Sequence, residues 1–164
     1  MAIVLTGIAI VAGAALGYVN SITAPTIEAL KVQQEKEAEQ EVLNGQEGSA
    51  IKITDPKGFG GALTVMVGLA QDGTILGYKV LESSETPGLG AKAQDWFQKG
   101  QKGDIIGKQA GKLEVSKDGG EVDAITASTI TSRAFLRCIN AAYKTLSEND
   151  AQSGASPQAK PNNN

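Results

Sequence analysis

A long apolar stretch opens the chain. No charged side chain occurs in residues 1–27, and residues 2–19 are apolar or small apart from Thr6. A helix running to Ile22 is about 31 Å long at 1.5 Å per residue, close to the thickness of the hydrocarbon core of a membrane. The pattern predicts a transmembrane anchor over residues 1–24. A signal peptide is the competing interpretation, but the stretch lacks the basic n-region of such peptides.

The next stretch is dense in Glu, Gln, Lys and Ala. Pro25 suits the first turn of a new helix, residues 26–43 are strong helix formers, and Asn44-Gly45 is a suitable helix end. Because the apolar positions form only a thin stripe, we expect a solvated stalk helix within residues 25–48.

Beyond residue 48 the hydrophobic pattern changes from helical spacing to short strand-like runs. Two of these runs are joined by Asp72-Gly73, a strong hairpin signal, and we expect this hairpin at the centre of an antiparallel sheet. The remaining expected elements are a short helix with two aromatic residues, a second hairpin and a final helix. The expected strands span residues 50–53, 62–70, 74–82, 112–116 and 121–125, and the expected helices residues 93–99 and about 129–146.

The sequence thus predicts an α+β fold: a single transmembrane helix followed by a small domain with an antiparallel sheet and packed helices. We expect this domain to occupy residues 49–147. Residues 148–164 are polar and rich in Ser, Gln, Asn and Pro, which indicates a flexible tail. Trp96 and Phe97 of the short helix are expected to pack in the core.

Composition narrows the chemistry. The net charge of −3 and the lack of a basic cluster argue against nucleic-acid binding. With no His and one Cys, the side chains alone cannot build a Ser-His-Asp triad, a Cys/His zinc site or an iron–sulfur cluster. Any redox chemistry must therefore come from an organic cofactor. Cys138 lies on the apolar stripe of the final helix, so we expect it to be a buried small hydrophobe.

Two properties of the anchor stay open. Gly13 and Gly17 form a small-xxx-small pattern, which either mediates packing against partner helices or reflects the usual composition of membrane helices. Lys31 and Lys36 follow the anchor but are interspersed with Glu, so the charge pattern does not determine the orientation.

The stretch from Asp123 to Arg133 carries most of the functional signal. It holds hydroxyl residues where a strand-like run turns into a helix, namely Thr126, Ser128, Thr129, Thr131 and Ser132. Hydroxyls at this position ordinarily cap the helix. A first helical turn also holds phosphate well, and Arg133 adds a cation, so capping and anion binding both remain open.

This run, Asp-Ala-Ile-Thr-Ala-Ser-Thr, resembles the flavinylation motif Asp-x-Ile-Ser/Thr-Gly-Ala-Ser/Thr of the FMN-binding domain family. The resemblance implies covalent FMN, joined through a phosphodiester to Thr129 by a separate flavin transferase, with Thr126, Ser128 and Thr131 around the phosphate. Ala127 and Ser128 replace the Gly and Ala of the pattern. Ala tolerates positive φ poorly, and the extra hydroxyl of Ser128 could be mistaken for the acceptor.

A second motif, Glu85-Thr-Pro-Gly-Leu-Gly90, reads on its own as a turn. Together with Gly58-Phe-Gly-Gly and the order of elements, it resembles the same family in the G subunit of Rnf complexes and the C subunit of the sodium-pumping quinone reductase. The resemblance implies that Glu85, Thr86, Gly88 and Leu89 form the site of the flavin ring.

The function implied is that of a membrane-anchored electron-transfer subunit of an ion-translocating ferredoxin:NAD oxidoreductase, rather than a complete enzyme. It implies other membrane subunits as partners, no catalytic acid or base, no metal, and an extracytoplasmic soluble domain. Two alternatives remain: a stand-alone membrane-tethered flavin reductase, and a tethered scaffold module that has lost its cofactor.

Overall fold

The structure, a computed structural model that describes residues 2–153, begins with one long helix, α1 (Ala2–Leu43). Pro25 lies inside α1, so the prediction that it starts a separate stalk helix is wrong. Proline removes one intrahelical N–H, but its fixed φ is compatible with a helix, and here the helix continues. The predicted end is confirmed: Asn44 and Gly45 have φ of 48° and 72°, and the Gln46 N–H bonds the Leu43 carbonyl at 2.8 Å.

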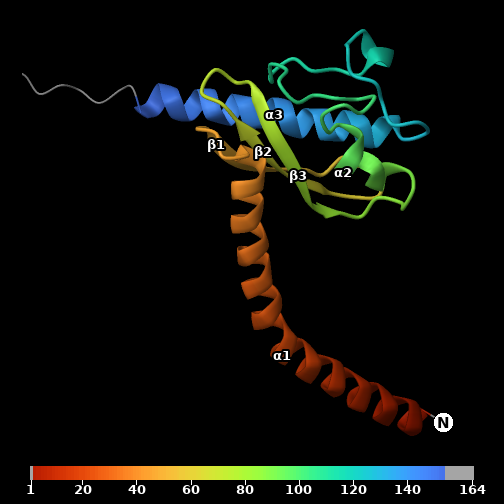
Figure 1. The fold of residues 1–164 in the computed structure, drawn as a ribbon. Helices are drawn as coiled ribbons and strands as arrows, with labels where there is room; N and C mark the ends of the chain where they lie inside the picture. Colours follow the sequence, from red (N-terminus) through yellow and green to blue (C-terminus); the bar gives the residue numbers. More distant parts are fainter. Residues whose placement is uncertain (1, 154–164) are drawn as a thin grey trace, which may run out of the picture. The chain divides into compact units, whose positions relative to one another are not determined.

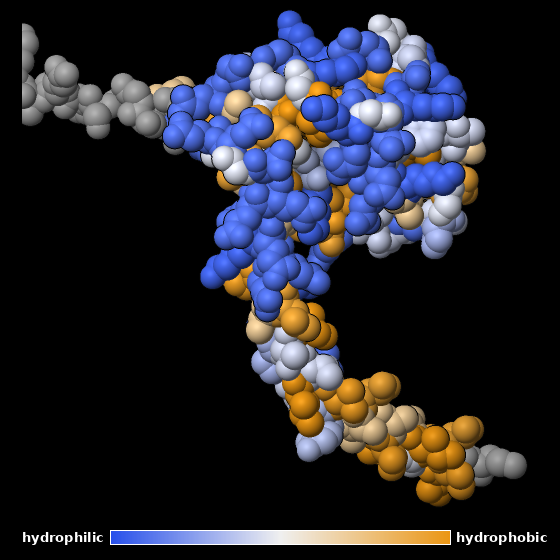
Figure 2. Space-filling model, in the orientation of Figure 1, coloured by the Kyte–Doolittle hydropathy of each residue, from blue (hydrophilic) through white to orange (hydrophobic). Residues whose placement is uncertain are grey.

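The chain divides into two compact units, Met1–Glu37 and Ala38–Asn164. The apolar beginning of the first unit is visible in Figure 2, where hydrophobic colour covers the N-terminal part of α1 and hydrophilic colour dominates the visible face of the second unit. Among the described residues, α1 is the one helix that is long and apolar enough to cross a membrane, judged by length and composition.

The second unit is built on a three-stranded antiparallel sheet in the order β1 (Ser49–Asp55), β2 (Leu63–Leu69) and β3 (Ile75–Ser83). The predicted hairpin at Gly73 is confirmed, since β2 and β3 pair from Leu69↔Ile75 to Leu63↔Ser83. All seven residues of β2 are buried, as expected for a central strand covered on both faces.

The C-terminal helix α3 (Thr129–Ser153) packs along one face of the sheet, against β1 and β2 (Figure 1). Its apolar stripe includes Phe135, Cys138 and Ile139, all fully buried. Burial raises the pKa of the Cys138 thiol to about 12, consistent with its predicted role as a small hydrophobe. The helix continues through residues 148–153, which the sequence assigns to a tail; residues 154–164 lie outside the described part of the chain.

The opposite face of the sheet is covered by the end of α1. Ala38 and Val42 are buried together with Met66 of β2. Gly68 and Gly77, on adjacent strands, make room for this contact, because a Cβ at either position would collide with the Val42 carbonyl oxygen. Sequence alternation along β2 therefore separates the side chains that face α3 from those that face α1.

A short helix, α2 (Ala93–Trp96), follows β3 and a 3₁₀ turn. Phe97 is fully buried and stacks on Phe135 with ring centroids 4.3 Å apart, so its predicted core role is confirmed. Trp96 packs partly buried against the same core and donates to the Asp123 carbonyl at 2.8 Å.

The second predicted hairpin, over residues 112–125, is wrong. Val115 and Val122 form a single isolated bridge of the parallel type, and a 3₁₀ turn, Ser116–Asp118, lies between them. The Gly120 N–H bonds the Val115 carbonyl, so the segment closes on itself before a strand ladder can form. This loop lies next to the start of α3, which gives it a part in the site.

Candidate functional site

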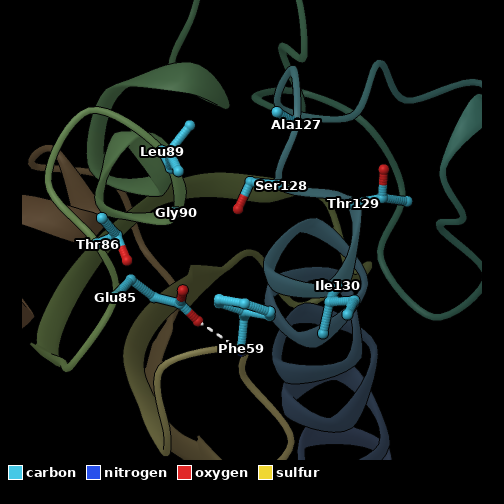
Figure 3. A pocket seen from close by; sticks show the side chains of 9 residues that line it. All are labelled: Phe59, Glu85, Thr86, Leu89, Gly90, Ala127, Ser128, Thr129 and Ile130. Atoms are coloured by element: carbon cyan, nitrogen blue, oxygen red, sulfur yellow. Dashed lines mark hydrogen bonds between the residues drawn. The ribbon is translucent and has the colours of Figure 1, made fainter.

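A cavity of about 350 Å³ lies between the loop after β3 and the start of α3 (Figure 3). The loop contributes one side and the first residues of α3 the other. The lining residues are Phe59, Glu85, Thr86, Leu89, Gly90, Ala127, Ser128, Thr129 and Ile130. The two sequence motifs, separated by more than thirty positions in the chain, therefore meet at one site.

The loop at residues 85–90 contains the predicted turn. Pro87 and Gly88 are its central residues, Gly88 has φ of 79°, and the Leu89 N–H bonds the Thr86 carbonyl at 3.1 Å. Proline followed by a residue with positive φ is the signature of a type II turn. The turn leaves Leu89 exposed at the edge of the cavity.

Glu85 holds this loop against a second glycine-rich segment. Its carboxylate is buried, and Oε1 accepts a hydrogen bond of 2.8 Å from the Phe59 N–H. Close approach explains the adjacent glycines, because a Cβ on Gly58 or Gly90 would collide with the Glu85 carboxylate. The carboxylate thus fixes the backbone that presents the exposed Phe59 ring at the cavity.

At the start of α3, three of the five hydroxyls have structural partners. The Ser128 hydroxyl donates to Thr131 Oγ1 at 2.9 Å. Ser132 Oγ accepts from the Ile125 N–H at 2.9 Å and donates to the Ser128 carbonyl at 3.0 Å. Ser128, Thr131 and Ser132 are all buried. Capping and bracing of the helix start therefore account for these three residues.

Thr129 differs from its neighbours. It is the first residue of α3, half-buried, at the cavity wall, and its Oγ1 accepts a hydrogen bond of 3.2 Å from Lys117 Nζ. The first intrahelical bond runs from the Ser132 N–H to the Ser128 carbonyl, so the N–H groups of residues 129–131 have no partner within the helix. A hydroxyl, a lysine ammonium and free helix N–H groups thus converge here.

Arg133 is not the cation at this position. Its guanidinium forms a two-point ion pair with Asp118, with distances of 2.7 Å and 2.6 Å. This pairing lowers the pKa of Asp118, chiefly through the hydrogen bonds from Arg133. The cation beside Thr129 is instead Lys117, which sequence reasoning missed because it lies twelve positions upstream, in a segment expected to be a strand hairpin.

Most of the predicted site residues come together. Glu85, Thr86, Leu89, Ser128 and Thr129 line the cavity, Thr131 lies buried beneath Ser128, and Gly88 and Thr126 are exposed and outside the lining. The additional lining residues are Phe59, Gly90, Ala127 and Ile130. Phe59 could have been noticed as the one large apolar residue within Gly58-Phe-Gly-Gly, where a turn alone does not call for it.

The surroundings of the cavity suit a flat, partly apolar ligand with an anionic group. Within the described residues of the second unit, the exposed large hydrophobic side chains are Phe59, Leu89 and Ile130, and all three line this cavity. Concentrated exposed apolar surface marks a binding site, and the cavity volume lies in the range of ligand pockets. Thr129, Lys117 and the free helix N–H groups provide the polar end.

Such a site on a small α+β domain defines a cofactor-binding domain, and comparison with known proteins identifies its family. Residues 58–144 match the FMN-binding domain family, and the chain belongs to it. Family membership implies FMN as the cofactor. The FMN-binding match includes every residue that lines the cavity.

Several relatives are named as the G subunit of an ion-translocating oxidoreductase complex. The protein from Vibrio atlanticus is 35% identical over 143 residues, which are 84% of this chain and 68% of that protein. The proteins from Salmonella typhi and Escherichia coli are 41% and 38% identical over 96 and 98 residues, or 56% and 57% of this chain. The matched regions span 47% and 48% of those two proteins.

Proposed function

We propose that this chain is an FMN-carrying, membrane-anchored subunit of an ion-translocating oxidoreductase complex, with FMN joined through its phosphate to Thr129. A bound flavin supplies one- and two-electron transfer, which the side chains of the described residues do not provide on their own. The observation that carries the proposal is the position of Thr129: a half-buried hydroxyl on the first residue of α3, at the wall of the cavity and beside a lysine ammonium.

The chain's own residues have distinct tasks in this proposal. Phe59, Leu89 and Ile130 would contact the apolar faces and edges of the flavin ring and keep water away from it. Glu85 fixes the two backbone segments that bring Phe59 and Leu89 to the cavity. Lys117 and the first-turn N–H groups would surround the phosphate.

Burial favours Thr129 over Ser128 as the acceptor. The Ser128 residue is 8% exposed, and its hydroxyl hydrogen is engaged with Thr131 Oγ1. A transferase must reach the oxygen that it modifies, and exposure therefore makes Thr129 the better acceptor of the pair. The same reasoning excludes the fully buried Thr131 and Ser132.

Mass spectrometry tests the attachment. The chain is purified from a host that contains the flavin transferase, and we expect the mass of one FMN less one water on the peptide that contains Thr129. Thr129→Ala should abolish this adduct, whereas Ser128→Ala, the matched control one residue away, should retain it. An unmodified wild-type chain would refute covalent flavin and favour the cofactor-free scaffold; an adduct that survives in Thr129→Ala would move the acceptor to Ser128 or Thr126.

The proposed partners are the other membrane subunits of the complex and the flavin transferase. Support comes from the relatives named as G subunits and from the apolar α1, which fits a single-pass anchor. Purification in mild detergent should retain membrane subunits of the complex; a chain that purifies alone yet reduces a soluble acceptor would support the stand-alone reductase.

We further propose that the second unit lies on the extracytoplasmic side of the membrane. This assignment follows the family resemblance, because the basic residues near α1 are mixed with acidic ones. Alkaline phosphatase fused to the end of the chain folds only outside the cytoplasm, so the fusion should be active. An inactive phosphatase fusion together with an active cytoplasmic reporter would reverse the orientation.

A further inference from the structure

The cation beside Thr129 is carried by a turn that is fastened on both sides. Lys117 is the middle residue of the 3₁₀ turn Ser116–Asp118. On one side the Ser116 N–H bonds the Val122 carbonyl at 2.8 Å, and the Ser116 hydroxyl donates to Asp123 Oδ1 at 3.4 Å. These bonds tie the turn to the beginning of the hydroxyl-rich motif.

On the other side the turn is tied to α3. Asp118 accepts two hydrogen bonds from the Arg133 guanidinium, and two-point arginine–carboxylate pairs impose a fixed geometry. Arg133 is one helical turn after Thr129, on the same helix. Asp118 and Arg133 therefore set the distance between the 3₁₀ turn and the start of α3, with Lys117 between the two fastened residues.

From this arrangement we propose that Lys117 is a phosphate-positioning residue, placed by the Asp123–Ser116 and Asp118–Arg133 contacts to orient the Thr129 hydroxyl and then to pair with the phosphate attached there. The inference rests on the proposed attachment of FMN to Thr129. A phosphodiester carries one negative charge, and one ammonium with the free N–H groups of the first helical turn matches it. Arg133 positions Lys117 without contacting the phosphate.

Two competing explanations for Lys117 are less economical. A surface lysine that meets a hydroxyl by chance would need no bracing, yet both neighbours of Lys117 are held by side-chain contacts. A lysine that only stabilises the loop would pair with an acidic group, whereas the bond that Lys117 forms ends on the Thr129 hydroxyl.

The test follows the rate of FMN attachment in the full-length chain, produced with the flavin transferase and sampled over time by intact-mass spectrometry. Lys117→Gln should slow attachment about tenfold, the effect of losing one charge-assisted hydrogen bond. Lys117→Arg should restore most of the rate, since it keeps the charge. Lys102→Gln, which removes the same charge from an exposed loop position, should match the wild type.

Phosphorus NMR of the loaded proteins gives a second readout that loop stability alone would not move. The phosphodiester resonance should shift between wild type and slowly loaded Lys117→Gln, and Lys117→Arg should lie nearer the wild type. Equal attachment rates for wild type and Lys117→Gln, an equal slowing by Lys102→Gln, or an unchanged resonance would each overturn the role of Lys117 alone. A wild-type chain without an adduct would overturn the attachment itself and this inference with it.

Discussion

Ala127 shows how one residue records a departure from the family pattern. The flavinylation motif has Gly at this position, and Ala127 keeps the left-handed backbone of a glycine, with φ of 60°. The sequence-based concern that Ala restricts the turn therefore takes a definite physical form: the turn is retained, and the alanine is strained. An L-residue in this region costs about 1–2 kcal/mol.

Replacing Ala127 by Gly should therefore stabilise the fold. We expect the free energy of unfolding in urea to rise by about 0.5–1 kcal/mol, since glycine relieves the strain but also gains freedom in the unfolded chain. Ala124→Gly is the matched control, because Ala124 lies in the same motif without positive φ, and this control should lower stability. A stabilisation by both substitutions would show that the backbone of Ala127 is not the cause.

At the scale of elements, an ion pair connects the first strand of the sheet to the helix that begins at the site. Arg137 of α3 donates to Asp55 at the end of β1, with Nε–Oδ2 of 2.6 Å and Nη2–Oδ1 of 3.1 Å. The Asp55 side chain is only 11% exposed, so water screens this pair less than an ordinary surface pair. Hydrogen bonds from Arg137 are the largest cause that lowers the pKa of Asp55.

The pair makes stability depend on pH in a definite direction. Because the pKa of Asp55 is lower in the fold than the ~3.9 of an unfolded chain, its stabilisation is complete above that value. It is lost as the pH falls through the lowered pKa of the folded state. Asp55→Asn should cost about 1–2 kcal/mol at pH 7 in urea unfolding, and the difference from wild type should shrink as the pH falls below about 4.

An exposed pair supplies the control for this effect. Glu148 and Lys144 lie one turn apart on α3 at 3.8 Å, and both side chains are largely exposed. Glu148→Gln should change the free energy of unfolding by less than about 0.5 kcal/mol at pH 7. If Asp55→Asn changes stability by no more than this control, the Asp55–Arg137 contact does not hold β1 to α3.

At the scale of the whole molecule, sequence reasoning succeeded where a local pattern decides the structure. The hairpin at Gly73, the end of α1 at Asn44 and the buried position of Phe97 each follow from turn chemistry or hydrophobic spacing. The family resemblance assigned the two separated motifs to a single flavin site. In the fold, Glu85 and Thr129 do line one cavity.

Features that depend on contacts distant in sequence could not be predicted. The segment around Lys117 has the composition of a strand hairpin, but its conformation is set by Asp123 and by Arg133 of α3. Lone charges in a sequence do not reveal which carboxylate they will find, so Arg133 was assigned the task that Lys117 is positioned to perform. Pro25 likewise reads as a helix start, although the flanking helix formers carry α1 through it.

The contact between the end of α1 and the sheet is open to a direct test. Val42 is 1% exposed and packs on Met66, so Val42→Ala in the full-length chain should lower the free energy of unfolding by about 1–2 kcal/mol in urea. Val32→Ala, on the same helix but 54% exposed, is the control and should have little effect. Equal effects of the two substitutions would mean that Val42 adds nothing to the sheet.

The same contact decides where this protein can be joined to another. A chimaera that receives a foreign membrane anchor should keep its own chain from Ala38 onward, because a junction in the loop at residues 44–48 would remove Val42 from the face formed by Gly68 and Gly77. Those two glycines would then border an open groove on the central strands. The useful splice point therefore lies inside a helix, several residues before the loop that a sequence-based design would choose.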